Sequence, residues 1–494
     1  MQVGTFIHRW LAGRIRLRKK NPLRLKLPVL FAFASTAAMA QFGPPPAAPP
    51  NGPAPVLQPR PQISYNGSLP TGEATATPLD LTLRDAIQRG LKYNLGILTS
   101  HDLADVAKAE RRRTLSTLLP SFYAAAIQTS GQNDLAAFGF SIPGFPAVVG
   151  PFGTENIRAY AQQTVYDRPS LRNLKSATES QKAAALSADD ARNLVVEAVS
   201  NAYLAVITDS ARAEAIEAEI ATAQALYDRA SDQKNAGTVA GIDVLRARLQ
   251  LRTEQQRLVA QKNQIGKGKL ALARVIGLPT GQVFNVVDTF PFAPLQTSLD
   301  SLIKQAVTQR PDYRAAEANV RAAEFAVQSA HSEHWPSVVV EADYGDIGSN
   351  FAHSHGTYDV TASVKVPIYA GGRTRTDIDQ AATVLRNRRN AVEDLRGRID
   401  FEVRNALLDL ESAAQQVDVA KENVGLATET LSQARDRFSA GVTDNIEVIE
   451  AQQALALANE NYIASLSQHN AAKIALATAL GAAEETVPVY LGLK

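Results

Sequence analysis

The clearest pattern in the chain is a stripe of apolar residues spaced three and four apart. Its members are Val392, Leu395, Ile399, Val403, Ala406, Leu410, Ala413, Val417, Ala420, Val424, Ala427, Leu431, Ala434 and Phe438. The mean spacing is that of a coiled coil, and from Val403 onward large and small residues alternate, so neighbouring helices can approach closely. The stripe predicts one helix over 373–439, on the order of 100 Å long, which a compact domain could not contain.

This helical pattern is interrupted at "FSAGVTDNIEVIEAQ", and nearly the same interruption, "KNAGTVAGIDVLRAR", occurs 204 residues earlier. Gly237 and Gly441 occupy the same place in the two segments, and a glycine there relieves the strain of a tight turn. Thr443 and Asp444 are placed to cap the returning helix. Two helical hairpins are therefore predicted: 169–235 with 240–277, and 373–439 with 444–481.

The rest of the chain follows the same duplicated plan. Each half is expected to hold a short helix (82–93 and 299–309), a medium helix (95–118 and 312–333), two extended segments and a long helical pair. A repeat of this length predicts a pseudo-symmetric molecule. We expect a first repeat at 79–281, a linker at 282–297, a second repeat at 298–485 and a C-terminal tail at 486–494.

The extended segments form two predicted β-hairpins, at about 120–166 and 336–369, in which apolar and polar residues alternate. The polar faces carry ionised side chains, namely Arg158, Glu341, Asp343, Asp359 and Lys365. Alternation alone suits any half-buried sheet. Strands of about ten residues with charges on one face fit a membrane barrel with lipid outside and water inside. Because four strands cannot close a barrel, the chain must oligomerise, and three copies would supply twelve strands.

The N-terminus is typical of an export signal. A basic region precedes the apolar run "LPVLFAFASTAA", and Ala38-Met39-Ala40 is a cleavage site, so residues 1–40 are predicted to be a signal peptide. Residues 41–78 are predicted to be a Pro-rich disordered segment, with nine prolines between 42 and 61. No other apolar run of about 20 residues predicts a transmembrane helix. The expected location is periplasmic, secreted or in the outer membrane.

Composition narrows the chemistry further. A formal net charge of +2 over 494 residues gives no electrostatic reason to expect nucleic acid as a partner. Cysteine is absent, which excludes disulfides and a lipid anchor on an N-terminal cysteine. The chain has no P-loop, nucleophile elbow, HExxH or dinucleotide motif, so neither an enzyme nor a cofactor is predicted. His331 and His334 could bind a divalent ion with Glu333, but ordinary surface residues are the favoured interpretation, and no metal site is predicted.

Three motifs, in this order and duplicated, point to a family. The segment "LTLRDAIQRGLKYN" opens the first repeat, "VPIYAGGRTR" joins the last strand to its helix, and both interruptions share the form AG-x(4)-I-[DE]-V-[LI]-x-A. From about Leu79 to Gly481 the chain resembles the TolC-type outer-membrane efflux proteins. The resemblance implies an α+β membrane protein in the bacterial outer membrane that extends into the periplasm.

The resemblance also implies an assembly. It would be a homotrimer in which a twelve-stranded outer-membrane β-barrel, in contact with outer-membrane lipid, continues into a long periplasmic α-helical barrel. The implied partners are a periplasmic adaptor (membrane-fusion) protein and an inner-membrane pump of RND, ABC or MFS type. The implied role is a passive exit duct for efflux or type I secretion, without ATP hydrolysis.

By the family pattern, Glu447 and Glu450 fall where a ring of acidic residues constricts the tunnel and favours cations. The alternative is that both carboxylates only stabilise a helix N-terminus. Asp243 matches an aspartate that latches the closed tip, but the partner positions here are Phe438 and Thr443, which cannot make those links. We therefore expect helix packing to hold the tip, Asp243 to cap its own helix and Arg246 to pair with Glu450.

A periplasmic coiled-coil structural or adaptor protein is the competing interpretation. It predicts soluble particles after cell fractionation, whereas the channel predicts a trimer that is extracted from outer membranes only by detergent. The sequence does not indicate the cargo, the pump or the adaptor.

Overall fold

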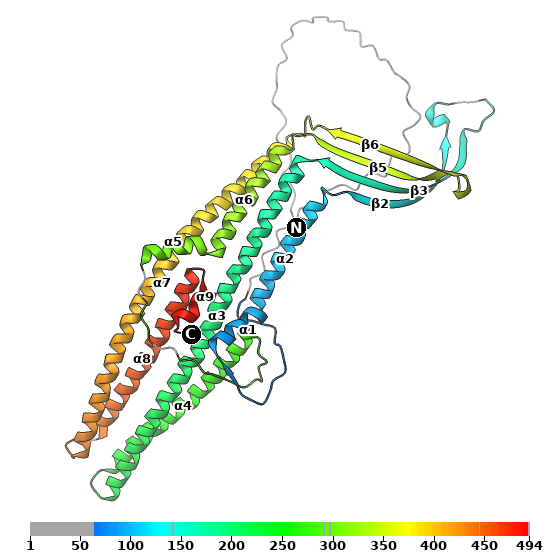
Figure 1. The fold of residues 1–494 in the computed structure, drawn as a ribbon. Coiled ribbons are helices and arrows are strands. Elements are labelled where there is room, and N and C mark those ends of the chain that lie inside the picture. Colours follow the sequence, from blue (N-terminus) through cyan, green and yellow to red (C-terminus); the bar gives the residue numbers. More distant parts are fainter. Residues whose placement is uncertain (1–63, 141–142, 290–291, 296–297, 444, 493–494) are drawn as a thin grey trace, which may run out of the picture. The chain divides into compact units, whose positions relative to one another are not determined.

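The computed structural model describes residues 64–140, 143–289, 292–295, 298–443 and 445–492 (Figure 1). The predicted signal peptide and most of the Pro-rich segment lie outside these residues. Residues 64–78 were expected to be disordered together with the rest of 41–78, and this part of the prediction is wrong. The backbone of Leu69 donates to Tyr93, Thr71 donates to Gly277, and Leu95 donates to Gly67, so this stretch is bound to the folded chain.

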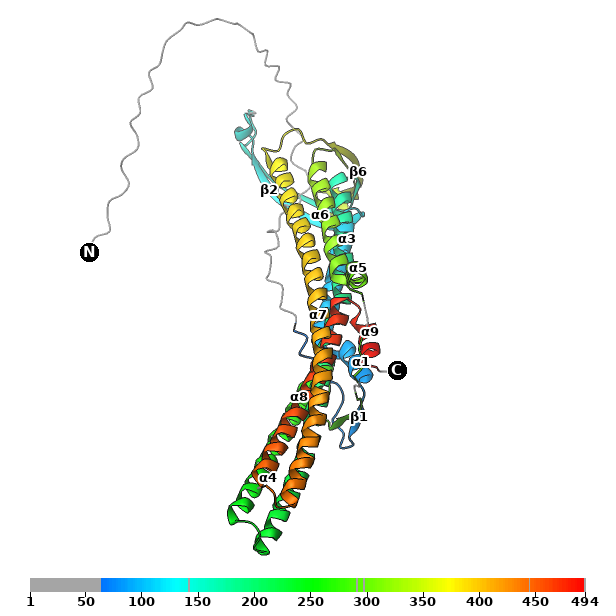
Figure 2. The same cartoon turned by 90° about the vertical axis from the view of Figure 1, so that its left-hand side faces the viewer.

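The long helices have nearly the predicted bounds. They are α3 (Arg168–Asn235), α4 (Gly241–Ile276), α7 (Arg373–Ser439) and α8 (Asn445–Ala479). Figures 1 and 2 show α3 beside α4 and α7 beside α8, and these pairs pack extensively. Gly237 and Gly441 adopt φ angles of 75° and 71° in the two connecting turns, a conformation that side chains with a Cβ disfavour.

The apolar stripe of α7 is confirmed as its packed face. Leu395, Ile399, Val403, Ala406, Leu410, Ala413, Val417, Ala420, Leu431, Ala434 and Phe438 are all buried. The remaining stripe members, Val392, Val424 and Ala427, are partly buried. A seam repeating every 3.5 residues stays on one side of a supercoiled helix, which is why the prediction holds over so many turns.

The shorter helices are α1 (Leu83–Tyr93), α2 (Leu95–Ser116), α5 (Leu299–Gln309) and α6 (Pro311–Ser332). Asn94 ends α1 and begins α2, where its side chain accepts a hydrogen bond of 2.8 Å from the Gly96 amide. Pro311 is the first residue of α6, a position that does not need its missing N–H. The order α1-α2-β2-β3-α3-α4 is followed by α5-α6-β5-β6-α7-α8.

Two short elements differ from the predictions. Helix α9 (Ala483–Tyr490) occupies part of the predicted C-terminal tail, and its Ala483 and Val487 are buried in the core. Strand β4 (Phe284–Val286) lies in the predicted linker and pairs in parallel with β1 (Leu79–Leu81). Elements this short contain no repeating pattern that a sequence could display.

The larger sheet has four strands in the order β2-β3-β5-β6, with every neighbouring pair antiparallel. Its strands are β2 (Ser121–Asp134), β3 (Val148–Tyr166), β5 (Ser337–Gly348) and β6 (Ser354–Lys365). The two predicted β-hairpins are β2 with β3 and β5 with β6, and pairing of β3 with β5 joins them into one sheet. Strand β6 ends at Lys365 instead of 369, because Pro367 lacks the N–H that a ladder needs.

The core of α3 explains its high apolarity. One 18-residue window of this helix is apolar enough to cross a membrane by length and composition, and half of that window is buried inside the protein. Val195, Val196, Val199 and Tyr203 belong to the largest core cluster, with residues of α1, α4, α8 and α9. The Tyr203 hydroxyl donates to the Leu81 carbonyl at 2.8 Å. The apolar window is therefore that of a packed core helix.

Candidate functional site

The register of the sheet places all five predicted lumen-facing residues on one face. Asp343 lies opposite Asp359, Lys365 opposite Ser337, and Arg158 opposite Gly345. Directly opposed residues share a face, and side chains two apart along a strand do the same. Arg158, Glu341, Asp343, Asp359 and Lys365 therefore form a single charged surface, which we call the polar face.

Two acidic side chains of the polar face have partners on the neighbouring strand. The Arg158 guanidinium forms an ion pair with Asp343 and donates to the Thr357 hydroxyl at 2.5 Å. Gln162 Nε2 donates to Glu341 Oε1 at 3.0 Å. Because Asp343 and Asp359 are directly opposed, the positive charge of Arg158 reduces the repulsion between them. The alternation of the sequence predicted this face but not these pairs.

The opposite face of the sheet is apolar and uncovered in the single chain. Tyr344, Tyr358, Val360, Val364 and Phe122 are between 65% and 78% exposed. Exposed apolar side chains in such number are costly in water. A sheet with a charged face and an uncovered apolar face fits a wall between water and lipid.

The two acidic residues after the second turn, Glu447 and Glu450, differ in their ion pairing. Glu447 pairs with Arg437 at 3.1 Å between Oε1 and Nη1. Glu450 is exposed and has no ion pair within the described part of the chain. The expected partner of Glu450, Arg246, pairs instead with Asp243, three residues before it in α4, at 3.4 Å. The prediction of an Arg246–Glu450 pair is wrong, because residues three apart on one helix are close neighbours.

Asp243 does not cap its helix as expected. Ala240 is the N-cap of α4 and makes no side-chain capping bond, while Asp243 lies in the first turn. Its carboxylate there still interacts favourably with the helix dipole. Thr443 precedes α8, and Asp444 lies outside the described residues, so the cap of α8 stays a prediction.

Both turns are joined by packing and by one residue that sequence reasoning missed. Phe438 lies in an apolar cluster with Leu226, Leu431 and Val448. Asn445 is fully buried at the start of α8, and its Nδ2 donates to the Asp243 carbonyl at 2.8 Å. An asparagine beside a glycine turn is typical of the turn itself, so its sequence position did not indicate a link between hairpins.

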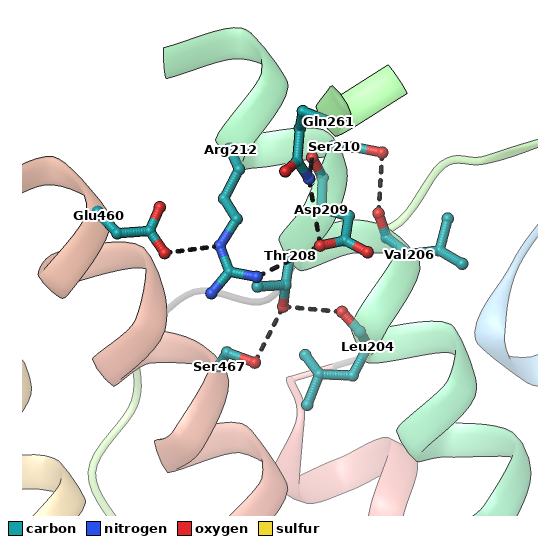
Figure 3. A network of polar contacts seen from close by, with 9 residues as sticks. All are labelled: Leu204, Val206, Thr208, Asp209, Ser210, Arg212, Gln261, Glu460 and Ser467. Carbon is teal, nitrogen blue, oxygen red and sulfur yellow. Dashed lines mark hydrogen bonds and ion pairs between the residues drawn. The ribbon is translucent and has the colours of Figure 1, made fainter. Parts of the chain in front are cut away.

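A polar network joins the two helical hairpins at a distance from their turns (Figure 3). Arg212 of α3 bonds Asp209 at 3.3 Å and Glu460 of α8 at 2.9 Å. Gln261 of α4 donates to the Asp209 carboxylate at 3.2 Å, and Thr208 bonds Ser467 at 3.0 Å. The network thus links α3 to both α4 and α8.

The histidines near the second hairpin do not gather around a common point. His331 lies in the last turn of α6, and the Glu333 carboxylate accepts a hydrogen bond of 3.1 Å from Thr374. His353 Nδ1 lies 2.8 Å from Asn350 Oδ1. In the part of the chain that the structure describes, no group of three or more His, Cys, Asp or Glu could hold a metal ion.

An antiparallel sheet with one charged and one apolar face, continued directly into paired long helices, is an arrangement that suits a membrane channel. The chain belongs to the outer membrane efflux protein family, whose sequence profile matches residues 100–278 and 302–482. It is an outer-membrane efflux channel of the TolC type, as its motifs indicated.

Relatives and solved structures agree with this family. The chain is 23% identical over 418 residues to the toluene efflux pump outer membrane protein TtgC of Pseudomonas putida, covering 81% of this chain and 83% of TtgC. It is 23% identical over 330 residues to the cation efflux system protein CusC of Escherichia coli, covering 64% and 71%. The outer membrane protein VceC of Vibrio cholerae has the same fold, with a TM-score of 0.71, 17% identity, and coverage of 81% and 96%.

Proposed function

We propose that three copies of this chain form one passive exit duct. Their sheets would close into a twelve-stranded outer-membrane barrel surrounded by lipid, and their long helices would form a tunnel through the periplasm. Cargo would enter from a periplasmic adaptor and an inner-membrane pump of RND, ABC or MFS type. The observation that carries the proposal is the pair of open sheet edges, β2 and β6.

An open edge cannot face lipid, because its N–H and C=O groups would have no hydrogen-bond partners there. Within the described residues, β2 and β6 each pair on one side only. The sheet has an even number of antiparallel strands, so β6 of one copy would meet β2 of the next in antiparallel orientation. A ring of copies therefore closes without a mismatch in strand direction.

Exposed apolar residues on the helices support the same assembly. In the single chain, Leu245, Leu249 and Val259 of α4 are 62–72% exposed, and so are Phe401 and Leu408 of α7, at 66% and 64%. Contact between copies would cover these side chains. The two separate matches to the family profile support a two-fold repeat within each chain.

The duct needs no chemistry of its own. Family membership favours the channel over a periplasmic coiled-coil or adaptor protein, and the uncovered apolar face of the sheet does not suit a soluble particle. Energy for transport would enter through the inner-membrane pump. We further propose that Glu447 and Glu450, repeated three times around the tunnel mouth, favour cations there.

The absence of cysteine allows a clean test of the ring. One cysteine would replace Ala126 of β2, paired in turn with Val360→Cys, Ala362→Cys or Val364→Cys on β6. Oxidation of the membrane-embedded protein should then give covalent dimers and trimers in at least one register, because strand neighbours lie within disulfide reach. The matched control is Ala161→Cys with Ala342→Cys, which are opposed within one chain and should give monomers only.

The largest covalent species formed on oxidation should contain three chains. Covalent species larger than three chains would contradict a trimer. Monomers alone in every register, with the control pair fully oxidised, would contradict pairing between β2 and β6.

A further inference from the structure

A cavity of about 110 Å³ lies between the two helical hairpins, away from the sheet and the turns. Its polar lining comes from Glu219 and Thr222 of α3, Gln250 and Glu254 of α4, and Gln452 and Asn459 of α8. From α7, Leu431 is the lining residue, and the rest of the wall is alanine and leucine. Among the described residues, Glu219 and Glu254 are the only charged groups that line it.

The two carboxylates share one cation. Arg257 Nη1 lies 3.0 Å from Glu219 Oε2 and 2.7 Å from Glu254 Oε2. Glu254 Oε1 also accepts a hydrogen bond of 2.7 Å from Gln250. The carboxyl side chains are only 15% and 6% exposed. Arg257 is more exposed, at 41%, so two poorly solvated carboxylates share one partly solvated cation, which leaves a net charge of −1.

The amide of Gln452 faces this site without a partner. The residue is 9% exposed, and neither its Oε1 nor its Nε2 has a hydrogen bond in the described structure. A buried amide without partners costs free energy, so such groups in proteins usually bind water or a ligand. Glu219, Gln452, Asn459 and Thr222, whose side chains all carry oxygen, thus line one small cavity.

The surroundings of Glu219 favour its protonated form. Burial raises its pKa to about 7, the positive charge of Arg257 opposes that rise, and the negative charge of Glu254 adds to it. With one proton bound, the site is electrically neutral. When the proton leaves, the cavity holds an uncompensated negative charge.

We propose that this cavity binds one small monovalent cation, Na⁺ or K⁺, in exchange for that proton. The donors are oxygens, which alkali cations prefer, and one positive charge restores neutrality. A divalent ion would leave a net charge of +1 beside Arg257. A separate open groove, lined by Arg212, Arg257, Gln261 and Glu460 among others, also contacts Arg257. The site lies between the hairpins, so its occupancy would strengthen their contact.

The test is hydrogen exchange of the purified full-length protein in detergent, read in peptides covering 215–225 and 448–460. Sodium is compared with N-methylglucamine, which is too large to enter, at equal ionic strength. At pH 8.5, Na⁺ at ten times its Kd should slow exchange in these peptides about tenfold. At pH 5.5 the proton occupies the site, and the two cations should give equal exchange. Glu219→Gln, which mimics the protonated form, should abolish the cation effect at pH 8.5.

Glu217→Gln is the matched control, because Glu217 lies on the same helix with an exposed side chain and should keep the full cation effect. Equal exchange in Na⁺ and N-methylglucamine at pH 8.5 would overturn the proposal, as would an unchanged effect in Glu219→Gln. Stronger protection by Ca²⁺ than by Na⁺ would also overturn it. The wild-type comparison stands even if a variant fails to fold. Its result is independent of whether the assembled protein conducts.

Discussion

Two basic side chains on α8, His469 and Lys473, are fully buried one helical turn apart. Neither has a hydrogen-bond partner in the described structure. Burial lowers the pKa of Lys473 to about 8, and burial together with the charge of Lys473 lowers the pKa of His469 to about 4. The fold thus disfavours the charged form of both residues.

Lys473→Met should therefore stabilise the protein at pH 7. The unfolded lysine binds its proton below about pH 10.4, whereas the folded one binds it only below about 8. The penalty is complete below pH 8 and disappears as the pH rises through 10.4. The gain at pH 7 should approach roughly 3 kcal/mol, by the free energy equivalent of that pKa difference. Thermal unfolding at pH 7 and pH 10 measures it.

The control for this substitution is Lys262→Met on α4, whose side chain is 59% exposed and which should change stability little. Destabilisation by Lys473→Met at pH 7 would show that the ammonium has a favourable partner in the assembled protein.

At the scale of elements, the sequence predicted the features that follow from a periodic residue pattern. It did not predict the contacts between elements that are distant in the sequence. The apolar stripe of α7 spans many turns, so its buried face could be read directly. Alternation likewise placed Arg158 and Asp343 on one face of the sheet. Their ion pair depends on the register of β3 against β5, and the Glu219–Gln452 cavity depends on which helices pack together. Neither relation is local in the sequence.

Gly345 tests the join between the two hairpins. It lies opposite Arg158, and a Cβ atom there would fall 2.5 Å from the Cα of Arg158, closer than the backbone allows. Gly345→Val should therefore separate β3 from β5 and sharply reduce the yield of trimer. Gly153→Val in β3 is the control, since its nearest neighbour would lie at 3.7 Å. Equal trimer yields on unheated gels would contradict this role.

At the scale of the whole molecule, the acidic residues near the turn are not equivalent. Arg437 already compensates Glu447, whereas Glu450 is exposed and unpaired among the described residues. If both line a common tunnel mouth, Glu450 supplies more of the free negative potential.

Glu450→Gln should therefore reduce cation selectivity more than Glu447→Gln. Reversal potentials of the purified channel in planar bilayers, under a KCl gradient, measure this difference. Glu422→Gln, an exposed position on α7 far from the turn, should leave selectivity unchanged. If Glu447→Gln and Glu450→Gln kept the same cation selectivity as the Glu422→Gln control, an acidic ring at this place would be excluded.

The two open edges of the sheet also have a genetic consequence. In the proposed ring no chain completes its membrane portion alone, so a faulty β2 or β6 would damage its neighbours' strands as well as its own. If the ring holds three chains, as proposed, equal and random mixing of normal and faulty chains would leave roughly one ring in eight intact. A lesion at either edge would consequently behave as a dominant allele.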